Sequence, residues 1–318
     1  MGAEPVVAPE LSKEEAAIFD RQIRLWGSNA QKQISESKVF CMGKVLSHIG
    51  NEVAKNICLS GVGSIVLCQT EEASDVGYLG QNLSEVAASL MEINKFCRVT
   101  VVESTATREQ ILKEAGSARA ICALGFNTPE LVHEIAHNAK ANRSKFFVGG
   151  TFGLCGAVFL DLGEHEYDAE VLDEDDASKP ATIERKKASF TSYGAVFDKD
   201  GSMRLSSTPC AAILSEILSQ SAKQASTSVQ SDSSGSFAQG VLAKCTDAKV
   251  SKRMVPDVDV LHELGRCAGV DLPPVSAIVG GIYGREVVKA ITAKDEPINN
   301  FFFFDAIRSA GLVENLSG

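Results

Sequence analysis

Residues 38–69 read KVFCMGKVLSHIGNEVAKNICLSGVGSIVLCQ, and their pattern decides the fold class. The apolar run Lys38–Gly43 ends in glycine and is typical of a buried strand. Apolar residues then recur at helical spacing, at Ile49, Val53 and Ile57. A second apolar run follows at Ser64–Cys68. A strand, a helix and another strand in this order predict a βαβ unit with parallel strands.

The same alternation continues to about residue 150. Further strand-like runs are Arg98–Val102, Ala120–Leu124 and Lys145–Gly150. Thr128 and Pro129 form a helix start, with threonine as the N-cap and proline at the first helical position. Near-continuous apolar strands that alternate with helices predict an α/β fold around a parallel sheet.

The pattern changes after Gly150. Residues Thr151–Gly163 have β character but no following helix, so we expect this segment to leave the parallel sheet. Residues Glu164–Asp176 carry eight acidic residues in thirteen. Their spacing favours a solvated loop over a metal site. The stretch Gln220–Gly240 is rich in Ser, Ala and Gln, which predicts a mobile segment.

Order is expected to return near the C-terminal end. A helix follows Pro273-Pro274, and one of its faces is nearly bare, at Ala277, Gly280, Gly281 and Gly284. So much glycine in a helix indicates close approach of another backbone, either in this domain or in a second subunit. The run NNFFFFDAI, residues 299–307, predicts a very apolar strand.

The overall composition excludes several classes of function. The 318 residues are 44% hydrophobic and 23% charged, with a net charge of -10 and a pI near 5.1. An acidic chain is a poor match for nucleic acid or for an anionic membrane. No apolar run approaches the roughly 20 residues that span a bilayer.

The nine cysteines are scattered, many of them in apolar runs, and form no CxxC pair. This usage is typical of reduced, buried thiols in the cytosol or nucleus, and it argues against structural zinc. Three cysteines, Cys155, Cys210 and Cys245, lie outside the clearest strands. None of them has a nucleophile signature, and no G-x-S-x-G motif occurs.

The loop after the first strand, Gly43–Gly50, is where a nucleotide would bind in such a fold. A working loop needs GxGxxG, whose glycines let the backbone approach the phosphates. Here only the outer glycines remain, with Leu46 and His48 between them. The second strand ends in Cys68-Gln69, where an acid should hold the ribose. We therefore predict that this chain binds no nucleotide of its own, and we interpret His48 as a solvated loop residue.

Several stretches make the chain resemble the adenylation domains of enzymes that activate ubiquitin-like proteins (E1 enzymes). They are FDRQIRLWG (Phe19–Gly27), Gly50–Ile65, Lys145–Glu166, and the C-terminal helix together with NNFFFFDAI. The resemblance implies a doubly wound, mostly parallel, Rossmann-like sheet of the E1/MoeB/ThiF type. The resemblance also divides the chain: residues 1–163 and 255–318 would form one inactive adenylation domain. Residues 164–254 are then an acidic, Ser-rich insertion that is partly disordered.

The same resemblance implies a heterodimer in which this chain is the non-catalytic half. A larger catalytic subunit would bind ATP and Mg²⁺, adenylate the modifier and receive it on a cysteine as a thioester, before an E2 enzyme takes it over. Chain length favours SUMO as the modifier, and another ubiquitin-like protein is the alternative. This chain would bind no cofactor and no metal, and would be present in nucleus and cytoplasm.

One residue carries over from the family by position, and it is Arg21. The matching arginine in the family reaches across the dimer to the ATP phosphates of the partner. The competing interpretation is an exposed helical ion pair between Arg21 and Asp20, and Arg24 is interpreted as structural. An NAD-dependent dehydrogenase would need the missing glycines and acid. A scaffold that has lost every enzymatic role is a further alternative.

Overall fold

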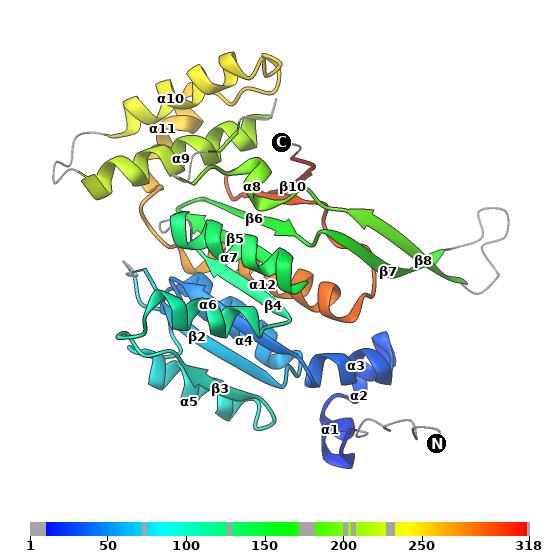
Figure 1. Cartoon of the computed structure of the whole chain (residues 1–318). Helices are drawn as coiled ribbons and strands as arrows, with labels where there is room; N and C mark the ends of the chain where they lie inside the picture. Colours follow the sequence, from blue (N-terminus) through cyan, green and yellow to red (C-terminus); the bar gives the residue numbers. More distant parts are fainter. Residues whose placement is uncertain are drawn as a thin grey trace.

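The computed structural model describes residues 11–71, 75–125, 129–171, 182–199, 203–204, 208–226 and 233–316. Its centre is an eight-stranded sheet with the order β10-β9-β6-β5-β4-β1-β2-β3 (Figure 1). The strands are β1 (Lys38–Gly43), β2 (Ser64–Gln69), β3 (Arg98–Val101), β4 (Ala120–Leu124), β5 (Lys145–Phe152), β6 (Cys155–Asp161), β9 (Phe301–Asp305) and β10 (Ala310–Glu314).

The five strands β1 to β5 are parallel, in the spatial order 3-2-1-4-5. The connecting helices are α4 (His48–Leu59), α5 (Leu83–Ile93), α6 (Arg108–Gly116) and α7 (Pro129–Asn142). The α/β prediction is confirmed, and so are the βαβ unit of residues 38–69 and the apolar strand at residues 301–305. The helix predicted at Thr128-Pro129 begins at Pro129, whereas Thr128 lies outside the described residues.

The sheet is covered on both faces, which explains its continuous apolar strands. Along β1, Val39 and Cys41 belong to one hydrophobic cluster, while Phe40 and Met42 belong to the other; all four are fully buried. Helices α4 and α5 cover the first face, together with α3 (Ser28–Ser35) and α12 (Pro273–Thr292). Helices α6 and α7 cover the second face.

The position of strand β6 differs from the sequence prediction. Residues 151–163 do not leave the sheet, since β6 lies beside β5 in antiparallel orientation. Phe152 pairs with Cys155, so only Gly153 and Leu154 connect the two strands. Gly153 has a φ of 56°, a backbone region that glycine reaches easily. A turn this tight returns the chain directly beside the strand it has left, and only a longer crossover could have kept it parallel.

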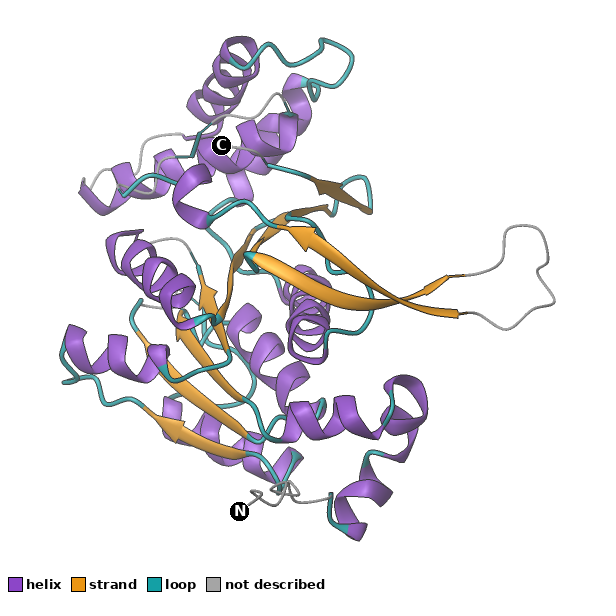
Figure 2. Ribbon diagram, turned by 45° about the vertical axis from the view of Figure 1, so that its right-hand side comes forward, coloured by secondary structure: helices purple, strands orange, loops and turns teal. Residues whose placement is uncertain are grey.

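The acidic segment after β6 is a strand and not a solvated loop. Strand β7 (Glu164–Val171) pairs antiparallel with β8 (Thr182–Ser189), and the hairpin projects away from the sheet (Figure 2). Residues 172–176 of the predicted loop lie outside the described residues. The acids of β7 face the bases of β8: Lys187 Nζ lies 3.0 Å from Glu164 Oε2, and Arg185 Nη1 lies 2.8 Å from Asp168 Oδ1. Cross-strand pairs of opposite charge favour this ribbon.

The Ser-rich stretch also has more structure than predicted. Helices α8 (Tyr193–Val196), α9 (Pro209–Ser226), α10 (Ser233–Asp247) and α11 (Val258–Cys267) form a group at one end of the molecule (Figure 1). The prediction of mobility is wrong for residues 233–240, because Phe237 and Ala238 are buried in the core. Helix α11 follows the predicted insertion in the sequence but packs against α10, with Gly265 next to the Phe237 ring.

The glycine-rich face of α12 packs mainly against α4 of the same chain. A Cβ atom added to Gly280 would lie 2.5 Å from the Cβ of Glu52, and one added to Gly284 would lie 2.7 Å from the Cβ of Asn56. A Cβ atom added to Gly281 would meet no atom within 4 Å apart from the backbone of its own helix. The close approach inferred from the sequence is therefore a contact within this domain at Gly280 and Gly284.

We expect His165, on β7, to make the protein sensitive to mild acid. Burial, followed by the charges of Lys145 and Arg185, lowers its pKa from 6.5 to about 4. Between pH 6.5 and 4 the unfolded chain thus binds a proton that the folded chain does not. The free energy of unfolding should fall with decreasing pH in this window, by up to about 1.4 kcal/mol per pH unit from this residue.

Urea unfolding at several pH values measures this dependence. His165→Phe should flatten it relative to the wild type, because the imidazole is removed while its packing against Tyr167 and Phe190 is kept. Equal slopes for the two proteins across the window would refute this role of His165.

Candidate functional site

The degenerate loop between β1 and α4 uses its backbone N–H groups internally. The N–H of Leu46 donates to Oε1 of Gln69 at 3.0 Å, and the N–H of Gly50 donates to Oγ of Ser47 at 3.3 Å. Gln69 stands where a nucleotide-binding fold places its ribose acid. Its side chain turns back to the loop and occupies a donor that would otherwise face a phosphate.

The N-terminus of α4 faces a carboxylate of the chain itself. The N–H of Ile49 lies 3.4 Å from Oδ2 of Asp271, a residue from the segment before α12. The other oxygen of this carboxylate, Oδ1, accepts hydrogen bonds from the hydroxyls of Thr151 and Ser276, the first at 2.8 Å. A helix N-terminus attracts anions through its free N–H groups and its dipole. Asp271 therefore stands where a phosphate would bind.

A further segment covers the loop from the β2 side. The N–H of Gly77 donates to the carbonyl of Leu46 at 2.7 Å, and the N–H of Leu79 donates to Oδ1 of Asn51 at 2.7 Å. Asn51 is fully buried and also donates to the carbonyl of Val45 at 3.1 Å. Hydrogen bonds from three directions thus close the loop with protein groups.

The two glycines that remain in the loop have a packing role. Gly43 has a φ of 98°, and a Cβ there would lie 2.3 Å from the carbonyl oxygen of Leu124 on β4. A Cβ at Gly50 would lie 2.4 Å from the carbonyl oxygens of Lys44 and Val45. These glycines are needed for the β1–α4 turn even without a bound phosphate. His48, predicted in a solvated loop, is instead the half-buried first residue of α4.

The stretch Phe19–Gly27 contains the helix α2 (Asp20–Trp26), which lies between α1 (Lys13–Ile18) and α3 in the sequence. Phe19 is only 5% exposed and lies against Gly61. The side-chain amide of Gln22 donates to the carbonyl of Leu59 at 3.1 Å. The indole N–H of Trp26 donates to Gln31 at 3.1 Å, and buried Gln31 donates in turn to the carbonyl of Ser60 at 3.0 Å. These contacts attach one side of α2 to the end of α4.

The other side of α2 presents Arg21 to solvent. Arg21 is exposed, and no described residue forms a hydrogen bond or ion pair with it. The proposed ion pair of Arg21 with Asp20 is absent, because Asp20 Oδ2 lies 3.0 Å from Nη2 of Arg24. Next to Arg21, two large apolar side chains are also exposed, Leu25 at 77% and Ile18 at 57%. Helix α2 thus presents a cation that pairs with no described residue, and exposed apolar side chains of α1 and α2 stand close to it in the sequence.

The described residues support neither a nucleophilic cysteine nor a metal site. All nine cysteines are free thiols and eight are buried, and burial raises the pKa of Cys155 and of Cys210 far above that of a reactive thiol. The run His133–His137 has the HExxH spacing of a zinc protease, but Glu134 pairs with Arg108. Within the described ranges, no group of three or more His, Cys, Asp or Glu residues could hold a metal ion.

The model of the ThiF family matches residues 19–317. The chain belongs to the ThiF family. It is 31% identical over 337 residues to SUMO-activating enzyme subunit 1 of Xenopus laevis, with 96% of this chain and 97% of that protein covered. It is 30% identical to the protein of the same name from Homo sapiens, with 96% of both covered, and 29% identical to subunit 1B-1 of Arabidopsis thaliana, with 97% and 98% covered.

Solved structures share the fold of this ThiF-family chain. PaaA superposes with a TM-score of 0.56 at 16% identity, covering 97% of this chain and 85% of that one. Escherichia coli MccB superposes with a TM-score of 0.54 at 12% identity, covering 94% and 72%. These similarities confirm the predicted Rossmann-like sheet. Among the helices of the described residues, none is long and apolar enough to cross a membrane.

The sequence of this ThiF-family chain drew attention to Arg21, whose role stays a prediction, and to the degenerate loop, but it did not indicate the residues that close the loop. In the sequence Gln69 indicates only that the ribose acid is missing, whereas in the structure its side chain accepts a hydrogen bond from the loop backbone. Asp271 stands 222 positions beyond Ile49 in the sequence, and no motif surrounds it. Only the packing of α12 against α4 brings the two together.

Proposed function

We propose that this chain is the non-catalytic subunit of a heterodimeric SUMO-activating enzyme. A larger partner of the same fold binds ATP and Mg²⁺, adenylates the C-terminus of SUMO and receives SUMO on a cysteine, from which an E2 enzyme accepts it. The chain supplies Arg21 to the ATP phosphates of the partner. Nucleotide chemistry then takes place at the interface and not at the loop of residues 43–50.

One observation carries this proposal: Arg21 is exposed, and pairs with no described residue, on a helix that is firmly attached to the domain. An arginine is always charged, and its guanidinium can offset the charge that develops as pyrophosphate leaves. The apolar side chains of Leu25 and Ile18 beside it suit a surface that a partner covers. The loop closed by Gln69 and Asp271 supports the assignment of ATP to the partner, as does the similarity to proteins named SUMO-activating enzyme subunit 1.

The chain alone should be inactive in ATP–pyrophosphate exchange, and addition of the larger subunit and SUMO should produce exchange. The reason is that the backbone donors for the phosphates are already occupied in this chain. Radiolabelled pyrophosphate incorporated into ATP measures the reaction. Strong exchange by the isolated chain would overturn the assignment of ATP to the partner.

The regulatory half of an enzyme for another ubiquitin-like modifier is the alternative within the family. Thioester formation by the complex with a panel of modifiers decides between them, because only the cognate modifier should form the partner thioester efficiently. An NAD-dependent dehydrogenase is disfavoured, since Gln69 and Asp271 occupy the loop where its cofactor would bind. Titration with NAD tests this directly.

A further inference from the structure

A pocket lies at the opposite end of the parallel strands from the closed loop. It is formed where α6 leads into β4 and α7 leads into β5, with Ala290 of α12 as one wall, and its volume is about 390 Å³. Its lining includes Arg119, Asn142, Arg143 and Lys145, together with two serines. Because these residues stand at the amino ends of β4 and β5, the pocket is separate from the loop and from α2.

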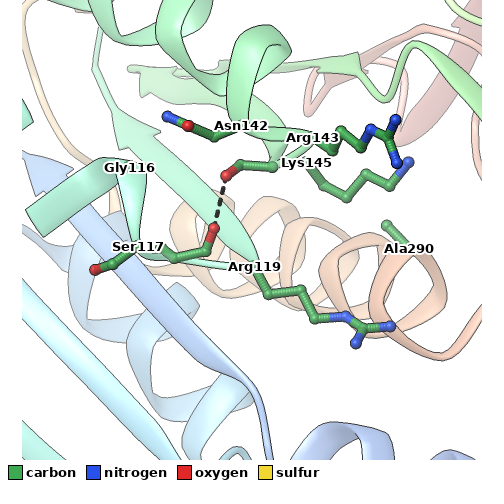
Figure 3. Close-up of a pocket in the computed structure, with 9 residues that line it drawn as sticks. Gly116, Ser117, Arg119, Asn142, Arg143, Lys145 and Ala290 are labelled. Atoms are coloured by element: carbon green, nitrogen blue, oxygen red, sulfur yellow. Dashed lines mark hydrogen bonds between the residues drawn. The ribbon is translucent and has the colours of Figure 1, made fainter. Parts of the chain in front are cut away.

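Three cationic side chains gather around this pocket. Figure 3 shows Arg143 and Lys145 extending together on one side of Ala290, with Arg119 on its other side. Nη2 of Arg119 donates to the carbonyl of Ile291 at 2.8 Å, and Nζ of Lys145 donates to the carbonyl of Leu162 at 2.9 Å. Two of the cations are thus fixed in place by neutral groups. Arg143 is exposed, and its side chain forms no hydrogen bond or ion pair with a described residue.

No described carboxylate forms an ion pair with any of the three. The nearest acid on α6, Glu114, is bound to Lys38 at 2.7 Å. Burial lowers the pKa of Lys145, and the charge of Arg119 lowers it further, whereas Asp161 acts in the opposite direction. Three cations without an ion-pair partner among the described residues stand out on a chain whose net charge is -10.

The negative C-terminal ends of nearby helices neutralise only part of the positive charge of these three side chains. Helices α6, α7 and α12 all end next to the pocket, and the C-terminal end of a helix favours cations. Each such end is equivalent to roughly half a negative charge, so three ends offset roughly 1.5 of the three positive charges. The remaining positive charge faces the cavity, which also presents the side-chain amide of Asn142.

We propose that this pocket binds a phosphate-bearing small anion. Guanidinium groups bind phosphate oxygens through paired, charge-assisted hydrogen bonds, and a half-buried lysine adds a point charge. The ligand lies between Arg143 and Lys145 on one side and Arg119 on the other. This assignment is independent of the proposed function, since the pocket shares no residue with α2 or the closed loop.

Binding of inorganic pyrophosphate to the full chain tests the proposal. Calorimetric titration should show saturable binding, and thermal unfolding should shift upward with pyrophosphate but not with sodium chloride of equal ionic strength. Arg143→Gln should weaken binding about tenfold or more without lowering the melting temperature of the unliganded chain, because the exposed Arg143 side chain forms no hydrogen bond or ion pair with a described residue. Lys145→Gln should weaken it similarly.

Arg266→Gln is the matched control, since this exposed arginine lies in the last turn of α11 but pairs with Glu263 at 3.0 Å. It should leave pyrophosphate binding unchanged. Two results would overturn the proposal. One is the absence of saturable binding by the wild type, and the other is equal affinity of the wild type and Arg143→Gln. Either result would mean that the three cations only neutralise the negative C-terminal ends of the helices and bind no anion.

Discussion

Arg21→Ala should lower ATP–pyrophosphate exchange by the heterodimer about 10²–10³-fold, the usual effect of losing one donor that stabilises developing charge. The chain should still fold and bind its partner, because the Arg21 side chain is exposed and forms no hydrogen bond or ion pair with a described residue. The dissociation constant of the heterodimer and the exchange rate at saturating ATP are measured together. Loss of rate without loss of binding identifies a group that acts on the reacting phosphates.

Arg24→Ala provides the control from the same helix. Its guanidinium is also exposed but pairs with Asp20, and a surface pair of this kind contributes about 0–1 kcal/mol to stability. Exchange should therefore remain close to that of the wild type. Arg21→Lys should recover only part of the rate, because an ammonium group cannot form paired hydrogen bonds to phosphate. Normal exchange by Arg21→Ala would instead support the scaffold alternative and end the proposed role in trans.

Gly280→Ala should destabilise the chain by about 1–3 kcal/mol, the usual cost of adding a methyl group to a filled interior. The new Cβ would lie 2.5 Å from the Cβ of Glu52 and would push α12 away from α4. The methyl carbon cannot move aside, since it is fixed to the helix backbone. Denaturant unfolding measures the change in free energy.

Gly281→Ala tests the same substitution one residue further along the helix. Nothing lies within 4 Å of its Cβ position, so alanine should raise the free energy of unfolding by about 0.5–1 kcal/mol through helix propensity. Equal effects at the two positions would contradict the packing of α12 on α4. Lower partner affinity of Gly281→Ala would point to a subunit contact at its exposed surface.

The local pattern of the sequence predicted most of the fold. Each parallel strand is buried on both faces, so its run of apolar residues stands out without any knowledge of its neighbours. The errors fell where neighbours decide the outcome. Residues 164–171 look like a solvated acidic loop until the bases of β8 are placed opposite them. Residues 233–240 look mobile until Phe237 meets Gly265 of α11.

For the candidate site, the sequence by itself determined what the loop lacks, because a missing glycine or acid is a local fact. It also drew attention to Arg21, through a stretch that resembles a known family. Only the tertiary structure decided that the loop is filled by Gln69 and Asp271 and that Asp20 pairs with Arg24 instead of Arg21. The physical reason is that hydrogen bonds and ion pairs depend on distances of about 3 Å. Such distances between residues far apart in the chain are set by the packing of helices and strands, and no spacing in the sequence encodes them.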